Sequence, residues 1–156
     1  MEIIVTKGIG KGTTGVSAFD AALMNAGIAD YNLIYLSSII PPASRLIIDK
    51  YEPREDEYGN RLYVVISRCD QYAFGKEAWA GLGWVTDEGG RGLFVEQKAE
   101  CEEEVVRLID HSLSDMRESR PYKFGEIAYS VVGIECEDRP VCAVVAAVYK
   151  SESFEQ

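Results

Sequence analysis

Histidine is nearly absent from this chain, and its cysteines do not form the closely spaced pairs that bind zinc. His111 is the only histidine among 156 residues, and the four cysteines (Cys69, Cys101, Cys136 and Cys142) include no Cys-x-x-Cys pair. Structural zinc sites use closely spaced pairs of cysteine and histidine. We therefore expect no metal, and we expect the cysteines to be thiols in a reducing compartment.

Positive charge is also scarce. The chain has 16 lysine and arginine residues against 26 aspartate and glutamate residues, which gives a formal net charge of −10. Binding to phosphate backbones requires clustered positive side chains, so we expect no nucleic-acid partner. An acidic surface attracts cationic substrates weakly, but it also simply keeps a protein in solution.

Long apolar runs are missing as well. A membrane-spanning helix needs about 18 to 20 consecutive apolar residues, and no segment of the chain approaches that length. No signal peptide is recognised at the N-terminus, which begins as a strand. Residues 1–156 are long enough to enclose a core, so we expect one cytoplasmic domain with no membrane association.

Hydrophobic periodicity predicts two helices. The first is expected over residues 17–26, with Ser17 as the N-cap and Gly27 just past the C-terminal end. The second is expected over residues 101–118, where apolar residues recur on one face. A glycine-rich turn is expected between a first strand at 2–6 and the first helix. It is not expected to be a phosphate loop, because it lacks the Gly-Lys-Ser/Thr signature.

The rest of the chain is rich in predicted strands, which makes the fold class α+β with mainly antiparallel sheets. The last strand is apolar from Val141 to Val148, so we expect it to be central and buried on both faces. Further strands are expected at 32–38, 44–50, 62–68, 78–85, 92–98 and 124–135.

The most informative segment is Tyr-Leu-Ser-Ser-Ile-Ile-Pro-Pro at residues 35–42. Proline lacks an N–H and fixes φ, so Pro41 and Pro42 end any strand that leads into them. The Ser37–Ser38 bond then lies at a strand end, where the Ser38 hydroxyl can attack the Ser37 carbonyl. Serine and proline also cluster at ordinary turns, and the segment by itself leaves that interpretation open.

Five motifs are spread along nearly the whole chain: Ser17–Ile28, Tyr31–Ile34, Ser37–Pro42, Ala80–Trp84 and Gly92–Glu96. Taken together, they resemble the pyruvoyl-dependent arginine decarboxylases. One departure is Ala43-Ser44 after the prolines, where a glycine is expected in many members.

The resemblance implies a cofactor made from the protein itself. Ser38 is expected to become a pyruvoyl group when the chain cleaves itself into residues 1–37 and 38–156, with no pyridoxal phosphate required. The implied activity is decarboxylation of L-arginine to agmatine and CO₂ through a Schiff base with the pyruvoyl group, in polyamine biosynthesis. The implied architecture is a four-layer α/β/β/α sandwich, assembled as a homotrimer with active sites between subunits.

The resemblance also assigns roles to further residues. Glu96 is the expected proton donor to the substrate carbon, and an apolar strand environment would suit that role. Asn32 lies an even number of residues before Ser38, so one continuous strand would place both on the same face. Substrate-binding roles are expected for Asp20, Leu23 and Ser37, with the Asp20 carboxylate accepting hydrogen bonds from the guanidinium group.

Each assignment has a purely structural alternative. Ser17-x-x-Asp20 is similar to a helix capping box, Asn32 can be a turn residue, and Glu96 can be an exposed glutamate at a strand end. A Ser38–His111 hydrolase is disfavoured because no Gly-x-Ser-x-Gly motif surrounds Ser38. Two alternatives for the whole protein remain: the same chemistry on another amino acid, and a non-catalytic, unprocessed paralogue that acts as a partner subunit.

Overall fold

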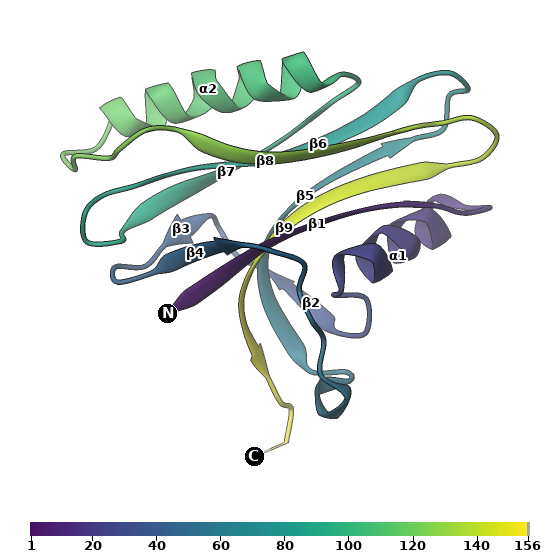
Figure 1. Ribbon diagram of the computed structural model, residues 1–156, viewed down its shortest axis with the longest axis horizontal. Helices are drawn as coiled ribbons and strands as arrows, with labels where there is room; N and C mark the ends of the chain where they lie inside the picture. Colours follow the sequence, from purple (N-terminus) through teal and green to yellow (C-terminus); the bar gives the residue numbers. More distant parts are fainter. Residues whose placement is uncertain (156) are drawn as a thin grey trace.

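The computed structural model describes residues 1–155 as four layers (Figure 1). Helix α1 (Gly15–Ala26) covers the outer face of a five-stranded sheet, and α2 (Glu102–Glu118) covers the outer face of a four-stranded sheet. The inner faces of the two sheets pack on each other around the largest hydrophobic cluster. The expected α/β/β/α sandwich is confirmed.

The two sheets are named here the large sheet and the small sheet. Neighbouring strands are antiparallel except for the pairs β2–β5 and β1–β4, which are parallel and lie at the two edges of the large sheet. In spatial order, the large sheet contains β2 (Asn32–Tyr35), β5 (Arg61–Gln71), β9 (Val141–Glu152), β1 (Glu2–Lys11) and β4 (Arg45–Ile48). The small sheet contains β3 (Ile39–Ile40), β7 (Gly92–Ala99), β6 (Glu77–Thr86) and β8 (Ala128–Glu135).

Strand β9 is the centre of the large sheet and is buried on both faces, as its apolar sequence predicts. Alternate side chains from Val141 to Ala147 face the small sheet, and those from Cys142 to Val148 face α1. Side chains of a strand alternate between its faces, so one continuous apolar run supplies both interfaces of this central layer.

The expected glycine-rich turn after the first strand is wrong, because β1 continues through that segment to Lys11. A Cβ atom at Gly8 would lie 2.2 Å from the Ala22 carbonyl oxygen, and one at Gly10 would lie 2.3 Å from the Ala22 nitrogen. The two glycines therefore allow α1 to pack against the backbone of β1, which is a role that a turn-based interpretation of glycine does not detect.

Helix α1 begins earlier than expected. Thr14 is the N-cap, and its side chain and backbone exchange hydrogen bonds with Ser17 in a capping box. Ser17 is therefore the third helical residue rather than the N-cap, and Asp20 takes no part in the box. Gly27 ends the helix with φ of 86°, as predicted.

The expected continuous strand from residue 32 to residue 38 is also wrong. Strand β2 ends at Tyr35 in the large sheet, and β3 begins at Ile39 in the small sheet. The three residues between them cross the gap between the sheets, and Ser38 has φ of 70°, which no extended strand can contain. The crossing explains why the predicted cleavage site belongs to neither sheet.

Helix α2 runs from Glu102 to Glu118 with Cys101 as its N-cap residue, in agreement with the expected span. Its buried residues Val105, Ile109 and Leu113 pack on the small sheet. Across residues 1–155, neither this helix nor α1 is long and apolar enough to cross a membrane.

Candidate active site

Ser38 lies in the crossing between the two sheets, in a strained backbone conformation. A left-handed φ costs a non-glycine residue roughly 1–2 kcal/mol and persists only where the surroundings enforce it. Here the Ser38 carbonyl accepts a hydrogen bond from the Phe94 N–H at 2.9 Å. The downstream residue Ile39 pairs with Leu93 in the small sheet. The small sheet therefore fixes the position of the serine.

Glu96 is the residue that Ser38 contacts. The Ser38 hydroxyl donates a hydrogen bond to the Glu96 carboxylate across 58 positions of sequence. Strand alternation on β7 turns Phe94 and Glu96 toward the large sheet, whereas Val95 faces α2. Glu96 is half-buried in the middle of the strand, which differs from the exposed strand-end glutamate of the structural alternative.

A pocket of about 320 Å³ opens beside Glu96, between β5 and β7. The Ser67 hydroxyl donates to the Gln97 carbonyl at 2.7 Å and ties the two strands together at this point. Arg68 also lines the pocket, but its guanidinium is held by Asp70 at 3.0 Å and stacks over the Phe19 ring. The hydrogen bond to Asp70 raises the pKa of Arg68.

Tyr149 reaches the same region from the end of β9. Its hydroxyl donates to the Ile39 carbonyl at 2.7 Å, and its ring lies 6.2 Å from the ring of Phe94 between centroids. Burial, and then the negative charge of Glu96, raise the pKa of the phenol. Tyr149 was not predicted as a site residue, because in the sequence it only follows an apolar run and no local pattern relates it to residue 39.

Asn32 is not brought into contact with Ser38 by a shared strand face, since β2 ends at Tyr35. Asn32 begins β2, is exposed, and donates a side-chain hydrogen bond to the Gly59 carbonyl at 2.8 Å. Ser37 is also exposed, and within residues 1–155 its hydroxyl has no hydrogen-bond partner. These two expected site residues therefore face outward from this chain.

Asp20 and Leu23 lie on α1, on the outer face of the large sheet. The Ser38–Glu96 pair lies on the inner face of the same sheet, so the sheet separates the two groups within one chain. The two helix residues also differ in burial, because Asp20 is exposed whereas Leu23 is only 7% exposed and packs beneath the helix. Within one chain, therefore, neither helix residue lies beside the Ser38–Glu96 pair, and their substrate-binding roles stay predictions.

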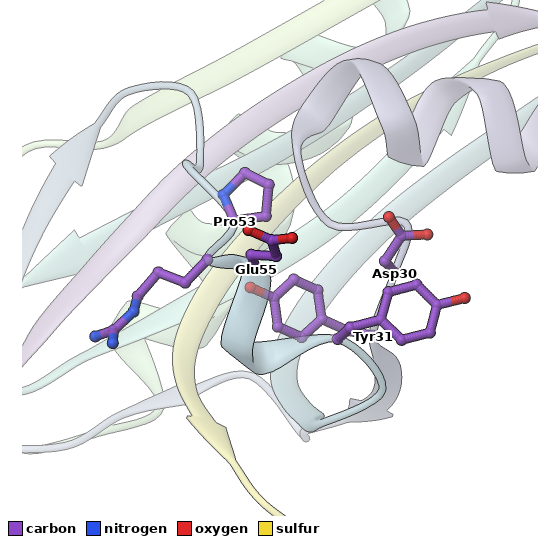
Figure 2. A pocket seen from close by; sticks show the side chains of 6 residues that line it. Asp30, Tyr31, Pro53 and Glu55 are labelled. Atoms are coloured by element: carbon purple, nitrogen blue, oxygen red, sulfur yellow. The ribbon is translucent and has the colours of Figure 1, made fainter.

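A wider hollow of about 580 Å³ lies elsewhere, next to the short helix η1 (Glu55–Glu57). Figure 2 shows Asp30, Tyr31, Pro53 and Glu55 around it. None of the expected site residues lines this hollow, although Asn32 follows Tyr31 directly in the chain. Within residues 1–155, moreover, no cluster of three or more side chains is suited to hold a metal ion.

The fold and this pair of residues define a class of protein: a two-sheet sandwich in which a strained serine at a strand crossing contacts a half-buried glutamate. Comparison with known proteins gives the family. The model of the pyruvoyl-dependent arginine decarboxylase family matches residues 2–154. The chain belongs to this family of decarboxylases.

Individual relatives agree with the family match. A pyruvoyl-dependent arginine decarboxylase of Thermococcus sibiricus is 32% identical over 140 residues, which cover 88% of this chain and 87% of the relative. One from Methanopyrus kandleri is 32% identical over 153 residues, covering 92% of each chain. One from Halobacterium salinarum is 39% identical over 94 residues, covering 60% of this chain and 58% of the relative.

Proposed function

We propose that this protein cleaves itself between Ser37 and Ser38 and then decarboxylates L-arginine to agmatine and CO₂. The observation that carries the proposal is the contact of the Ser38 hydroxyl with Glu96 at the crossing between the sheets. The match to a family of pyruvoyl-dependent arginine decarboxylases supports both the self-cleavage and the choice of substrate in this proposal.

The position of the Ser38 hydroxyl beside Glu96 supports the proposed self-cleavage. In the proposed reaction, Glu96 accepts the hydroxyl proton while the oxygen attacks the Ser37 carbonyl carbon. The bond from that carbon to the Ser38 nitrogen breaks, the nitrogen takes up the proton from Glu96, and an ester remains. Loss of the Ser38 α-proton then expels the Ser37 carboxylate and leaves dehydroalanine at position 38. Water replaces its nitrogen, which departs as ammonia, and the product is a pyruvoyl group on residues 38–156.

The surroundings of residue 38 suit a pyruvoyl group, in which a ketone oxygen takes the place of the Ser38 nitrogen and a methyl group takes the place of its side chain. The only side-chain partner of the Ser38 hydroxyl among residues 1–155 is Glu96, and the carbonyl of residue 38 is already held by the Phe94 N–H. The pyruvoyl group, when present, supplies an electron sink for the bond that breaks as CO₂ leaves. Glu96 would then hold the proton that returns to the substrate carbon.

Recognition of the substrate is assigned to residues of the smaller fragment. The Asp20 carboxylate is the proposed partner of the guanidinium group, Asn32 and Ser37 the proposed polar contacts, and Leu23 an apolar one. Because the large sheet separates Asp20 from Ser38 within one chain, we propose that a neighbouring copy supplies it in a trimer. The exposed side chains of Ile34, Tyr35 and Ile39 near the crossing offer an apolar surface for such a neighbour.

The proposed setting is polyamine biosynthesis in the cytoplasm. All four cysteines are unpaired, which fits a reducing compartment. Light scattering of the purified protein tests the assembly: three copies per particle support the trimer, and a monomer that decarboxylates arginine contradicts it.

The intact mass of the denatured protein is the direct test of the proposed function. Two fragments, residues 1–37 and a 38–156 piece whose mass requires a pyruvoyl rather than a serine terminus, would support self-cleavage. Agmatine release from arginine, measured against other amino acids, would then establish the substrate. A single full-length mass after prolonged incubation would contradict the proposal and favour the non-catalytic paralogue.

A further inference from the structure

Tyr149 occupies an irregular position in the large sheet. Val148 pairs with Val64 and Lys150 pairs with Tyr63, so Tyr149 has no partner residue on β5. The ladder of β1 also ends at Val148. An extra residue of this kind is a β-bulge. Alternate side chains from Val141 to Ala147 face the gap between the sheets, and Tyr149 continues that series and packs against the same inter-sheet core.

The hydroxyl of this ring makes a single, specific contact. It donates to the carbonyl of Ile39, the residue immediately after Ser38, at 2.7 Å. Because burial and the Glu96 charge raise the pKa of the phenol above its ordinary value, the hydroxyl keeps its proton at neutral pH and remains a donor. Its ring is half-buried against Phe94, whose N–H holds the Ser38 carbonyl.

We propose that Tyr149 is a positioning residue that holds the peptide after Ser38, so that residue 38 stays beside Glu96 both before and after the chain is cut. The inference rests on the proposed self-cleavage and deepens it. Once the 37–38 bond is broken, residue 38 becomes a chain terminus, and its backbone would otherwise be held by the two-residue strand β3 and the Phe94 N–H. Tyr149 adds the only side-chain hydrogen bond to Ile39 within residues 1–155.

The variant Tyr149→Phe removes the hydroxyl and keeps the ring. Self-cleavage, followed by intact mass over time, is expected to slow about three- to tenfold, the effect of losing one hydrogen bond. Tyr63→Phe is the matched control, because it removes a tyrosine hydroxyl of the same sheet that bonds to Glu152 at 2.9 Å, away from Ser38. The control is expected to cleave at the parental rate.

Two further readouts separate positioning from a general loss of structure. In the Tyr149→Phe variant, amide hydrogen exchange of residues 39–40 is expected to accelerate while the thermal midpoint stays close to that of Tyr63→Phe. For the fraction that is cleaved, kcat per pyruvoyl group is expected to fall with KM for arginine unchanged, because the proposed guanidinium contact lies on α1.

Parental rates of cleavage and exchange in Tyr149→Phe would overturn the inference. Slower cleavage accompanied by the same loss of thermal stability and the same slowing in Tyr63→Phe would also overturn it, because the effect would then not be specific to residue 149. If the parent chain is never cleaved, the proposed function fails, yet exchange at residues 39–40 still decides whether Tyr149 holds this segment.

Discussion

The two sides of the Ser37–Ser38 bond are held very differently. Upstream, the last anchors are the Leu36 N–H, which donates to the Val64 carbonyl at 2.8 Å, and the Leu36 side chain, which packs against the inter-sheet core. Ser37 itself is exposed. Downstream, residue 38 is held through its carbonyl and its hydroxyl, and the fully buried Ile40 follows two residues later.

This asymmetry matches what each side would have to do. The downstream side would carry the cofactor, whose reactive carbon must stay at a fixed distance from Glu96 for efficient proton transfer. The upstream side would become a free carboxyl terminus at Ser37, which is proposed to contact the substrate. A bond that is held firmly on its downstream side can therefore be cut without displacing residue 38, which would carry the cofactor.

Removing the nucleophile is expected to have the largest effect. Ser38→Ala should remain a single full-length chain with no arginine decarboxylase activity, because no hydroxyl is left to attack the Ser37 carbonyl. Alanine is tolerated in the left-handed region elsewhere in this chain, at Ala43 with φ of 63°, so the fold should survive. Ser37→Ala is the comparison variant, and intact mass should show that it is still cut. Cleavage of Ser38→Ala would refute the assignment of the nucleophile.

The next largest effect is expected from Glu96→Gln, which keeps the shape of the side chain and removes its acid–base function. Self-cleavage and turnover should each fall by about 10²–10⁴-fold, the usual contribution of general acid–base catalysis. Glu100→Gln on the same side of the molecule is the control, since its side chain is 63% exposed and it should behave like the parent. Intact mass measures the rate of self-cleavage, and CO₂ release measures the rate of turnover. Equal rates in Glu96→Gln and Glu100→Gln would contradict a role of Glu96 in either step.

Truncating one anchor on each side would test the asymmetry directly. Ile40→Ala is expected to lower the free energy of unfolding by about 2–5 kcal/mol, as for a fully buried isoleucine, and Leu36→Ala by roughly half as much. Urea unfolding in the Ser38→Ala background keeps the chain intact, and both variants are compared at one protein concentration because the stability of a trimer depends on it. A larger loss for Leu36→Ala would reverse the comparison.

The smallest effect concerns the turn beyond the prolines. Ala43 has φ of 63°, a left-handed conformation that costs an L-residue about 1–2 kcal/mol of stability. Glycine avoids this cost, but the greater conformational entropy that it gives the unfolded chain lowers stability by about 0.4–1 kcal/mol. Ala43→Gly should therefore raise the free energy of unfolding slightly, by about 0.5–1 kcal/mol. Thermal unfolding in the Ser38→Ala background measures it, and a clear loss of stability would contradict the backbone argument.

Much of the architecture was predictable because it depends on local pattern. The apolar run from Val141 to Val148 identified the central strand, and the stripe around Ile109 identified α2. The error at the end of the first strand has a cause in tertiary packing. At Gly8 the glycine serves close packing against α1 rather than a turn, and such a role depends on a segment that is distant in the sequence.

The candidate site was likewise predictable only in part. From the order of residues alone, the fold class could be predicted, and the resemblance to a family singled out Ser38 and Glu96, because local periodicity and side-chain chemistry are properties of the sequence. The contact between these two residues, the crossing of the chain between sheets at Ser38, and the hydrogen bond from Tyr149 to Ile39 emerge only from the folded structure. They depend on strand register, which is settled by packing between segments more than 50 residues apart.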